Sequence, residues 1–194
     1  MRLRVEIRRF LLGFAILLAA CLQAAPVIAG PYRDFAERLN ESPPNGTAFR
    51  PDLEDLLADL ANSYRAEEDK EPLTPDPMLR ELARAHAADM MINDFVGHKA
   101  STGHDFSSRV SAFVGDASRF PSIGENAARD TQKTPVDAKK ARALFAQWIK
   151  SRSHRKNLVN RSFRFVSTGV IQRGNSIWAV QVFFATPREK GLFQ

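Results

Sequence analysis

Residues 163–184 read FRFVSTGVIQRGNSIWAVQVFF, and this stretch decides the fold. Its two halves, 163–173 and 176–184, are rich in β-branched and aromatic residues, and Gly174-Asn175 between them is a tight-turn signal, so we expect an antiparallel β-hairpin. In the second half the side chains are largely apolar on both alternating faces. Because such a strand has no face suited to water, the hairpin must be covered by other elements on both sides.

Three amphipathic helices precede the hairpin and can supply this cover. Apolar residues recur at helical spacing after Pro51, after the N-cap and first-turn pair Asp76-Pro77, and between residues 136 and 150. Helices on both faces of a small antiparallel sheet predict a mixed α/β (α+β) protein that folds as a three-layer α-β-α sandwich. Two shorter helical turns are expected near residues 106–113 and 154–160.

Length and composition favour one globular domain. The chain has 194 residues, of which 44% are hydrophobic and 26% charged, and this excludes collagen-like, coiled-coil and wholly disordered chains. Cys21 is the only cysteine, so neither an intramolecular disulfide nor a cysteine-based zinc finger can form. Prolines and a glycine within residues 42–46 predict a linker over 30–50, followed by an ordered domain over 51–187 and a tail over 188–194.

The first 29 residues have the pattern of an export signal peptide. Four arginines precede an apolar run over residues 10–22, and small residues end the segment at Ala29. The run is shorter than the roughly 20 residues that a membrane-spanning helix needs, so no membrane span is expected in the mature chain. Arg8-Arg9 resembles a twin-arginine signal, whereas the residues ending at Cys21 resemble a lipobox. We therefore expect an exported protein, periplasmic or secreted, with Cys21 either discarded or lipidated.

Charge is distributed unevenly along the chain. The formal net charge is +6, of which the export signal carries +3, so the remainder is weakly basic and no nucleic-acid partner is expected. Residues 51–94 hold twelve acidic and four basic residues, whereas residues 131–173 hold eleven basic residues and one acidic residue. Either the two segments face and neutralise each other, or both are solvated faces, or the basic one attracts a lipid head group or wall polymer in a salt-sensitive way.

Imidazole chemistry is limited to four histidines, His86, His98, His104 and His154. His86 lies on the apolar stripe of the second helix and is expected to be a hydrogen-bonded structural residue. His98, Glu125 and His154 are 27 and 29 residues apart, which is no local metal motif, so spacing alone does not bring them together. The chain lacks a GxSxG elbow, an HExxH helix and a phosphate-binding glycine loop, which removes the common hydrolase and nucleotide-binding templates.

A set of short motifs follows in order along residues 51–187. Its members are Asn62–Arg65, Pro72, Leu73, Leu79, Ala83, His86, Ala87, Asp89, Met90, His98, Gly103, Arg109, Gly124–Asn126, Trp148, Ser151, His154–Leu158, Thr168–Val170 and Gln181–Phe183. No single motif is decisive, but the ordered set behind an export signal resembles the CAP superfamily. These are the SCP-like domains of cysteine-rich secretory proteins, antigen 5 and pathogenesis-related 1 proteins, here in the bacterial single-domain form.

The resemblance implies a central cleft lined by two histidines and two glutamates, which binds a divalent metal such as zinc in several members. On this resemblance His98, Glu125 and His154 take three of the four places. Neutral imidazole nitrogens and a carboxylate oxygen suit Zn²⁺, and three protein ligands would leave one coordination position open.

Two departures from the family pattern bear on this metal. Ser151 stands where the second glutamate of many members follows the tryptophan, and Arg152-Ser153 replaces the usual Pro-Gly before His154. The cleft, which on this resemblance also includes Asn126, therefore either binds a metal through three ligands or is metal-free, with its polar groups bonded to one another or to water.

Other motif residues are expected to have structural roles. Arg65 and Arg109 are expected to be internal charge partners. Trp148 and Trp178 are expected to be core residues, and Glu125 and Asn126 are as well suited to tying a loop to nearby backbone as to binding a ligand.

The resemblance implies two main functions. The first is an extracytoplasmic binding module, acting as a monomer, whose partner is a lipid, a wall polymer or a partner protein of the cell envelope. The second is a zinc-dependent hydrolase or protease in which His98, Glu125 and His154 hold the metal that activates water, with Glu125 as the candidate catalytic residue. A structural surface protein without a small ligand is a third alternative.

Overall fold

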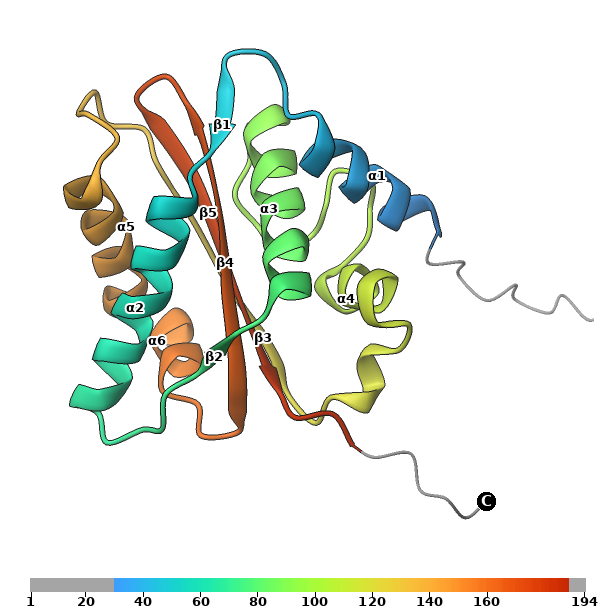
Figure 1. Cartoon of the computed structure of the whole chain (residues 1–194), viewed down its shortest axis with the longest axis vertical. Coiled ribbons are helices and arrows are strands. Elements are labelled where there is room, and N and C mark those ends of the chain that lie inside the picture. Colours follow the sequence, from blue (N-terminus) through green and yellow to red (C-terminus); the bar gives the residue numbers. More distant parts are fainter. Residues whose placement is uncertain (1–29, 189–194) are drawn as a thin grey trace, which may run out of the picture.

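The structure, a computed structural model, describes residues 30–188 as six α-helices around one five-stranded sheet (Figure 1). The helices are α1 (Gly30–Glu41), α2 (Pro51–Glu67), α3 (Pro77–Ile92), α4 (Phe106–Val114), α5 (Ala138–Lys150) and α6 (Arg152–Leu158), with a short 3-10 helix, η1 (Ala117–Arg119), after α4. The strands are β1 (Thr47–Phe49), β2 (Thr74–Pro75), β3 (Ile123–Asp130), β4 (Phe163–Arg173) and β5 (Ser176–Ala185).

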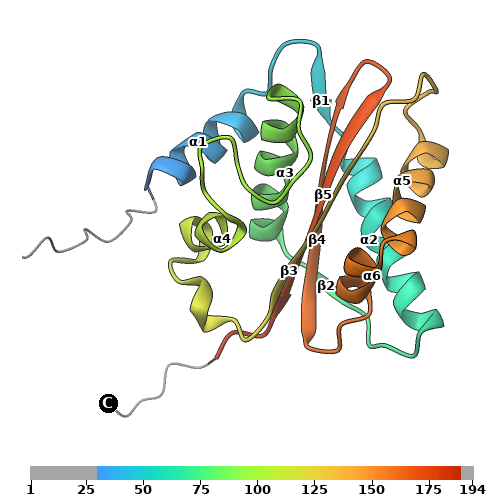
Figure 2. The ribbon, with the colours of Figure 1, turned by 180° about the vertical axis from the view of Figure 1, so that it is seen from behind.

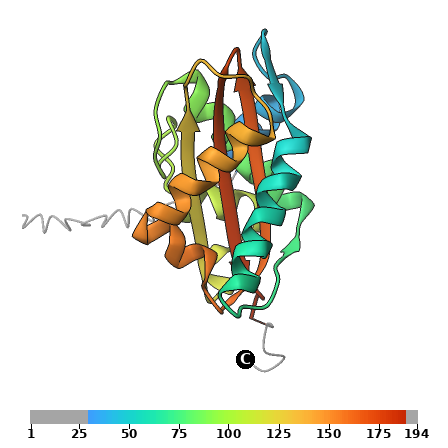
Figure 3. The same ribbon diagram turned by 90° about the vertical axis from the view of Figure 1, so that its left-hand side faces the viewer.

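These elements form three layers. The strand order is β1-β4-β5-β3, with antiparallel pairing throughout, and the short β2 pairs parallel with the other end of β4. Helices α2, α5 and α6 cover one face of the sheet, and α1, α3 and α4 cover the other (Figures 1 and 2). Figure 3 shows the first of these helical layers from outside. The predicted three-layer α-β-α sandwich is therefore confirmed.

Strands β4 and β5 form the predicted hairpin in the middle of the molecule. Arg173 pairs with Ser176, and Gly174 takes a positive φ of 57° in the turn between the strands. Every residue of β5 after Ser176 is buried. Its side chains alternate between the two helical layers, with Trp178, Val180, Val182 and Phe184 in the core under α3 and Ile177, Ala179 and Phe183 in the core under α2 and α5.

The three predicted long helices form, and capping fixes where they start. The side chain of Asp76 accepts a hydrogen bond from the Leu79 N–H at 3.0 Å, which caps α3 as expected. Asp137 caps α5 through the Lys140 N–H in the same way, so this helix starts two residues later than residue 136. The two weaker predictions, near residues 106–113 and 154–160, correspond to α4 and α6.

The outer edge of β4, between β1 and β2, is closed by Glu54 of α2. Its carboxylate accepts two hydrogen bonds from Arg84 of α3, at 2.7 and 2.6 Å, and one from the Val170 N–H at 3.1 Å. Beside it, a Cβ at Gly169 would lie 2.2 Å from the backbone nitrogen of Arg84, so α3 lies directly on the strand backbone. This edge therefore fixes both helical layers to the sheet.

The expected linker over residues 30–50 is instead part of the domain. Residues 30–41 form α1, in which Tyr32 and Ala36 are fully buried, and β1 pairs with the end of β4. The prolines and glycine of residues 42–46 interrupt regular secondary structure only in the turn between these two elements, where Gly46 has a φ of 75°. The export-signal prediction for residues 1–29, with Cys21, lies outside the described residues, as does most of the tail.

The segment around Glu125 is also different from the loop that the sequence favours. Residues 123–130 form β3, an edge strand that pairs with β5 along its whole length. Its glycine and alanines have low strand propensity, so the sequence carries no strand signal there. Gly124 is required by packing, since a Cβ would lie 2.8 Å from the Phe163 ring.

Trp148 and Trp178 are buried core residues, as predicted. Arg65 is also buried, but it bonds the backbone carbonyls of Glu71, Leu158 and Asn160. It bonds no carboxylate of residues 30–188, so neutral acceptors replace the expected charge partner. No helix of residues 30–188 combines the length and apolar character needed to cross a membrane.

Candidate functional site

The candidate residues gather on both sides of the edge strand β3. Successive residues of a strand point to opposite faces of the sheet, so Glu125 faces α4 and Asn126 faces α6. The segments that carry the two histidines approach this strand from the two helical layers. We refer to the six residues concerned as the β3 site: His98, Arg109, Glu125, Asn126, His154 and Asn157.

A buried ion pair between Glu125 and Arg109 forms the centre of the site. The Arg109 Nη2 atom donates to both carboxylate oxygens, at 2.9 and 2.8 Å. The exposed fraction of the side chain is 0% for Arg109 and 1% for Glu125. Burial by itself would raise the pKa of Glu125, but the charge of Arg109 and the hydrogen bond from His98 outweigh it and lower this pKa. Glu125 is therefore an ionised carboxylate inside the protein.

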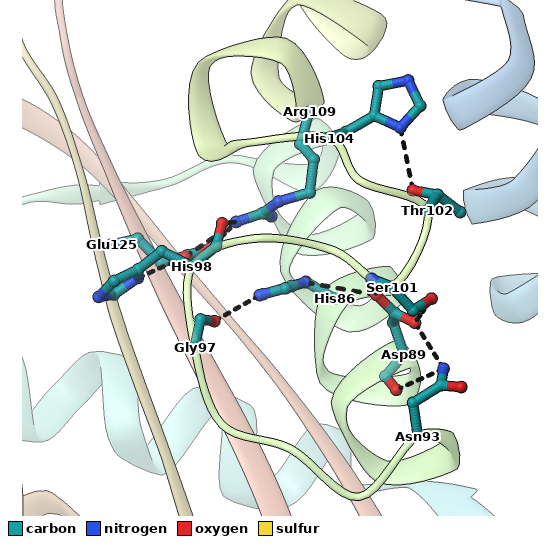
Figure 4. A network of polar contacts seen from close by, with 10 residues as sticks. All are labelled: His86, Asp89, Asn93, Gly97, His98, Ser101, Thr102, His104, Arg109 and Glu125. Carbon is teal, nitrogen blue, oxygen red and sulfur yellow. Dashed lines mark hydrogen bonds and ion pairs between the residues drawn. The ribbon is translucent and has the colours of Figure 1, made fainter.

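His98 connects this buried pair to the surface. Its Nδ1 lies 2.8 Å from the Glu125 Oε1 atom, and because an ionised carboxylate can only accept, Nδ1–H is the donor (Figure 4). The hydrogen bond to Glu125 raises the pKa of His98 above its ordinary value, although partial burial opposes it. The His98 side chain is 56% exposed, which leaves the second ring nitrogen, Nε2, free for a ligand.

The end of α3 holds the loop that carries His98. The His86 ring is fully buried and its Nε2–H donates to the Gly97 carbonyl oxygen at 2.8 Å. Figure 4 shows the ring pointing toward this loop. Asp89 accepts hydrogen bonds from the Ser101 N–H, at 2.9 Å, and from the Ser101 hydroxyl. Arg109 adds a hydrogen bond of 3.0 Å to the His98 carbonyl oxygen. His86 is thus the structural histidine that the sequence predicts.

The other side of β3 is an uncharged amide network. The Asn157 side chain of α6 donates to the Glu125 carbonyl oxygen at 3.1 Å and to the Asn126 Oδ1 atom at 2.9 Å. Asn126 in turn donates to the His154 carbonyl oxygen at 3.3 Å. Burial, followed by the charge of His98, lowers the pKa of His154. The charge of His98 therefore acts on the protonation of His154 across the edge strand.

One expected member of the site, Ser151, lies apart from the β3 site. The Ser151 hydroxyl, at the junction of α5 and α6, bonds the Ser153 hydroxyl at 3.1 Å and no member of the β3 site. His104 bonds the Thr102 hydroxyl at 2.9 Å through its Nδ1 atom. Five cavities of 220 to 420 Å³ lie elsewhere on the surface, and none of these five is lined by His98, Glu125 or His154, so the expected cleft stays a prediction.

The donor set of the site does not fit a divalent metal in this arrangement. Both carboxylate oxygens of Glu125 accept hydrogen bonds from Arg109, and one also accepts from His98. A metal bound to this carboxylate would lie next to the Arg109 cation. Within residues 30–188, no three histidine, cysteine or acidic side chains are grouped so that they could hold a metal. The zinc site through His98, Glu125 and His154 therefore stays a prediction, and no chemical step is assigned to it.

The sequence did not reveal the roles of two residues of the site, Asn157 and Arg109. Asn157 was noted only as part of a motif, yet it joins the two strand positions that face opposite layers. Arg109 was expected to be an internal charge partner, which is confirmed, but its partner could not be named. The only signal for Asn157 was its place in the segment after His154.

Comparisons with known proteins agree with this fold. The pattern of CAP, the cysteine-rich secretory protein family, matches residues 58–183. An uncharacterized protein of Bacillus subtilis (strain 168), YkwD, is 33% identical over 129 residues, which make up 66% of this chain and 46% of that protein. This chain therefore spans about half the length of that relative.

Two solved structures are similar in fold. The first is an extracellular protein containing an SCP domain from Bacillus anthracis, with a TM-score of 0.57 and 25% identity over 69% of this chain and 40% of that one. The second is an outer surface protein from Borrelia burgdorferi, with a TM-score of 0.58 and 18% identity over 70% of this chain and 93% of that one. Since the family pattern covers well over half of its length, this chain belongs to the cysteine-rich secretory protein (CAP) family.

Proposed function

We propose that this protein is an extracytoplasmic binding module that recognises a component of the cell envelope through the β3 site. The observation that carries the proposal is the fixed imidazole of His98. Its Nδ1–H is held by Glu125, which is held in turn by Arg109, while the ring remains half exposed. A side chain whose orientation is set before binding loses little conformational entropy when it contacts a ligand.

The exposed nitrogen of His98 defines what the site can recognise. In the neutral imidazole Nε2 accepts a hydrogen bond, and in the protonated form it donates one. Because the pKa of His98 is raised, the protonated form persists to higher pH than for an ordinary histidine. Val96, two residues earlier in the same loop, is one of two exposed large apolar side chains of the described residues. The loop therefore carries an exposed apolar side chain two residues before the hydrogen-bonding group of His98.

Binding is favoured over hydrolysis by the condition of Glu125. The charge of Arg109 and the hydrogen bonds from Arg109 and His98 lower the pKa of Glu125, so this carboxylate is a weak general base. No serine or cysteine among the described residues hydrogen-bonds the His98 ring, so a nucleophile activated by this histidine is also missing. A hydrolase mechanism would need Glu125 to be released from Arg109 and a nucleophile to be brought to His98.

A location outside the cytoplasm is supported by two independent features. The first 29 residues have the composition of an export signal. The two similar solved structures are described as an extracellular protein and an outer surface protein. The envelope component is a lipid, a wall polymer or a partner protein, with which the protein acts as a monomer.

The binding test uses two histidines of the same loop. The purified protein, His98→Ala and His104→Ala are co-sedimented with purified peptidoglycan sacculi and, separately, with phosphatidylglycerol vesicles. His104 is the matched control because it lies in the same loop, and its ring hydrogen-bonds Thr102 and packs against Tyr32, neither of which belongs to the β3 site. We expect His98→Ala to weaken binding about tenfold and His104→Ala to leave it unchanged. Equal binding by all three proteins, or by none, would contradict the proposal.

The metal and hydrolase alternatives need their own measurement. Zinc is titrated calorimetrically into the wild-type protein and His98→Ala at neutral pH. We expect no difference in heat between the two, because the carboxylate needed as a third ligand is bound to Arg109. A stoichiometric heat that disappears in His98→Ala would establish the metal site, and hydrolysis that is then lost in Glu125→Gln would establish the enzyme.

A further inference from the structure

A continuous stretch of the chain is basic and free of acids. Residues 138–173 contain ten basic residues and no acidic residue. Two of these are used inside the fold, since Lys140 pairs with Asp130 at 3.3 Å and Arg173 lies over the Trp178 ring. Six others are exposed on α5 and α6, and we refer to them as the α5–α6 basic face: Lys139, Arg142, Lys150, Arg152, Arg155 and Lys156.

The basic face follows one side of the molecule as a stripe. Arg142 and Lys150 follow Lys139 by three and eleven residues, a spacing that places all three on the same side of α5. At the rise of an α-helix, Lys139 and Lys150 are about 16 Å apart along the axis. Helix α6 begins directly after Ser151, and the two helices lie together on the outside of the sheet (Figure 3).

The cations of this face make no ion pair within residues 30–188. No ion pair there joins the acidic segment 51–94 to residues 131–173 either; Asp55, for example, pairs with Arg80. Asp137, the nearest acid in sequence, caps α5. Direct ion pairs between the two charged segments are therefore not observed among residues 30–188.

We propose that the α5–α6 basic face binds a linear polyanion of the cell envelope that carries phosphate groups at regular intervals. Arginine guanidinium groups bind phosphate oxygens in pairs, and lysines add point charges. A row of cations on two consecutive helices offers successive contacts to a linear chain. Arg155 is already oriented, because its Nη1 atom donates to the Ile149 carbonyl oxygen at 2.9 Å.

A polymer fits this face better than a bilayer does. Peripheral binding to a membrane is strengthened by exposed apolar side chains that enter the interface. The two exposed large apolar side chains of the described residues, Ile92 and Val96, lie at the end of α3 and just after it, in the other helical layer. The basic face therefore has charge but no apolar anchor.

The basic face borders the β3 site without depending on it. Helix α6 carries His154, whose carbonyl oxygen accepts from Asn126, and next to it the exposed Arg155 and Lys156. A polymer on the basic face would thus pass beside the β3 site. The proposal does not need His98, so it can fail or succeed separately from the proposed function.

The test compares two double variants with the same change in charge. Arg142→Gln/Arg152→Gln removes two cations of the basic face, and Arg38→Gln/Arg188→Gln removes two exposed arginines on α1 and after β5. The side chains of these four arginines make no hydrogen bond or ion pair within residues 30–188. Binding of each purified protein to long-chain linear polyphosphate is measured by calorimetry at several salt concentrations, with circular dichroism as the check on folding. Binding of polyphosphate by His98→Ala and binding of the wild-type protein to phosphatidylglycerol vesicles are measured in the same way.

We expect the wild-type protein and His98→Ala to bind polyphosphate equally. Arg142→Gln/Arg152→Gln should bind about tenfold more weakly at low salt, and the slope of log affinity against log salt should fall by about two. Arg38→Gln/Arg188→Gln should change the affinity by less than about twofold. Equal weakening in both double variants, or no binding of polyphosphate by the wild type, would overturn the proposal. Binding to vesicles but not to polyphosphate would also contradict the proposal and would indicate that the partner of the basic face is a membrane.

Discussion

The two edges of the sheet are closed by the same kind of ion pair but end in different chemistry. At the β4 edge, Glu54 binds Arg84 through both oxygens and also accepts from a backbone N–H. At the β3 edge, Glu125 binds Arg109 through both oxygens and also accepts from His98. The partners of Glu54 are thus a buried backbone group and two partly exposed arginines, Arg84 and Arg80. At the β3 edge the arginine is fully buried, and an imidazole that is 56% exposed carries the network to the surface.

This difference indicates why only one edge is a candidate site. A buried carboxylate must be paired, and either edge meets that need. Only at the β3 edge does the pairing also determine the orientation and protonation of an exposed group. The four predictions that follow test the contrast between these edges, from the largest expected effect to the smallest.

The largest effect is expected from removing the two arginines. Arg109→Met removes the only permanent cation that contacts the buried Glu125 within residues 30–188 and leaves it with His98 alone, so we expect the free energy of unfolding to fall by about 3–5 kcal/mol. Arg84 is 25% exposed, so water can partly replace it, and Arg84→Met should cost about 1–3 kcal/mol. Urea denaturation followed by circular dichroism measures both. Losses of equal size would show that the two edges have the same electrostatic role.

The second prediction concerns the protonation of His98. Glu125→Gln removes the carboxylate that raises the pKa of His98, so this pKa should return toward its ordinary value. With less charge on His98 at neutral pH, the pKa of His154 should rise. Glu54→Gln at the other edge should change neither. Histidine titrations followed by NMR give all three values, and an unchanged His98 in Glu125→Gln would contradict the assigned hydrogen bond.

The third prediction is the pH dependence of stability at the β3 edge. Because the pKa of His98 is raised by folding, its contribution to stability is fully present below the ordinary histidine value and is lost as the pH rises through the folded value. For His154 the pKa is lowered, so its unfavourable contribution grows as the pH falls below the ordinary value.

Urea midpoints at about pH 5 and pH 8 measure this dependence. His98→Gln should lose more stability relative to wild type at the lower pH, and His154→Gln should gain stability there. The same direction of change in both variants would be inconsistent with the opposite shifts of the two imidazoles.

The smallest effect is expected at Ser151. Its hydroxyl bonds only the neighbouring Ser153 hydroxyl, so Ser151→Ala should change the free energy of unfolding by no more than about 0.5 kcal/mol. The His98 titration should be unaffected. A clear shift of the His98 pKa in this variant would mean that Ser151 belongs to the β3 site after all.

The parts of the fold with a strong local pattern could be predicted from the sequence. The hairpin was visible because β5 is apolar on both faces, and α3 because Asp76 and Pro77 mark its start. Strand β3 was not, because its glycine and alanines have weak strand propensity and pairing with β5 alone makes it a strand. Helix α1 was hidden by the prolines that follow it, although Tyr32 and Ala36 have helical spacing.

The candidate site follows the same division. His98 and Glu125 were paired through a family resemblance, and in the structure the His98 Nδ1 atom lies 2.8 Å from the Glu125 Oε1 atom. The importance of Arg109 for this pair could not be read from the sequence, since its position relative to Glu125 depends on how α4 packs over the edge strand. Ser151 was included by alignment with a family position, and local backbone geometry at the junction of two helices directs it elsewhere.

The early start of α1 limits how far the domain could travel if Cys21 carries a lipid. Nine residue steps separate Cys21 from Gly30, and a fully extended chain covers about 3.5 Å per step, so the tether would reach at most roughly 30 Å. Had the folded part begun at Pro51, the reach would have been roughly 100 Å. With so short a tether, the domain would contact only partners within the layer next to the bilayer. The position of the start of α1 on the domain would then determine which surface faces away from the bilayer.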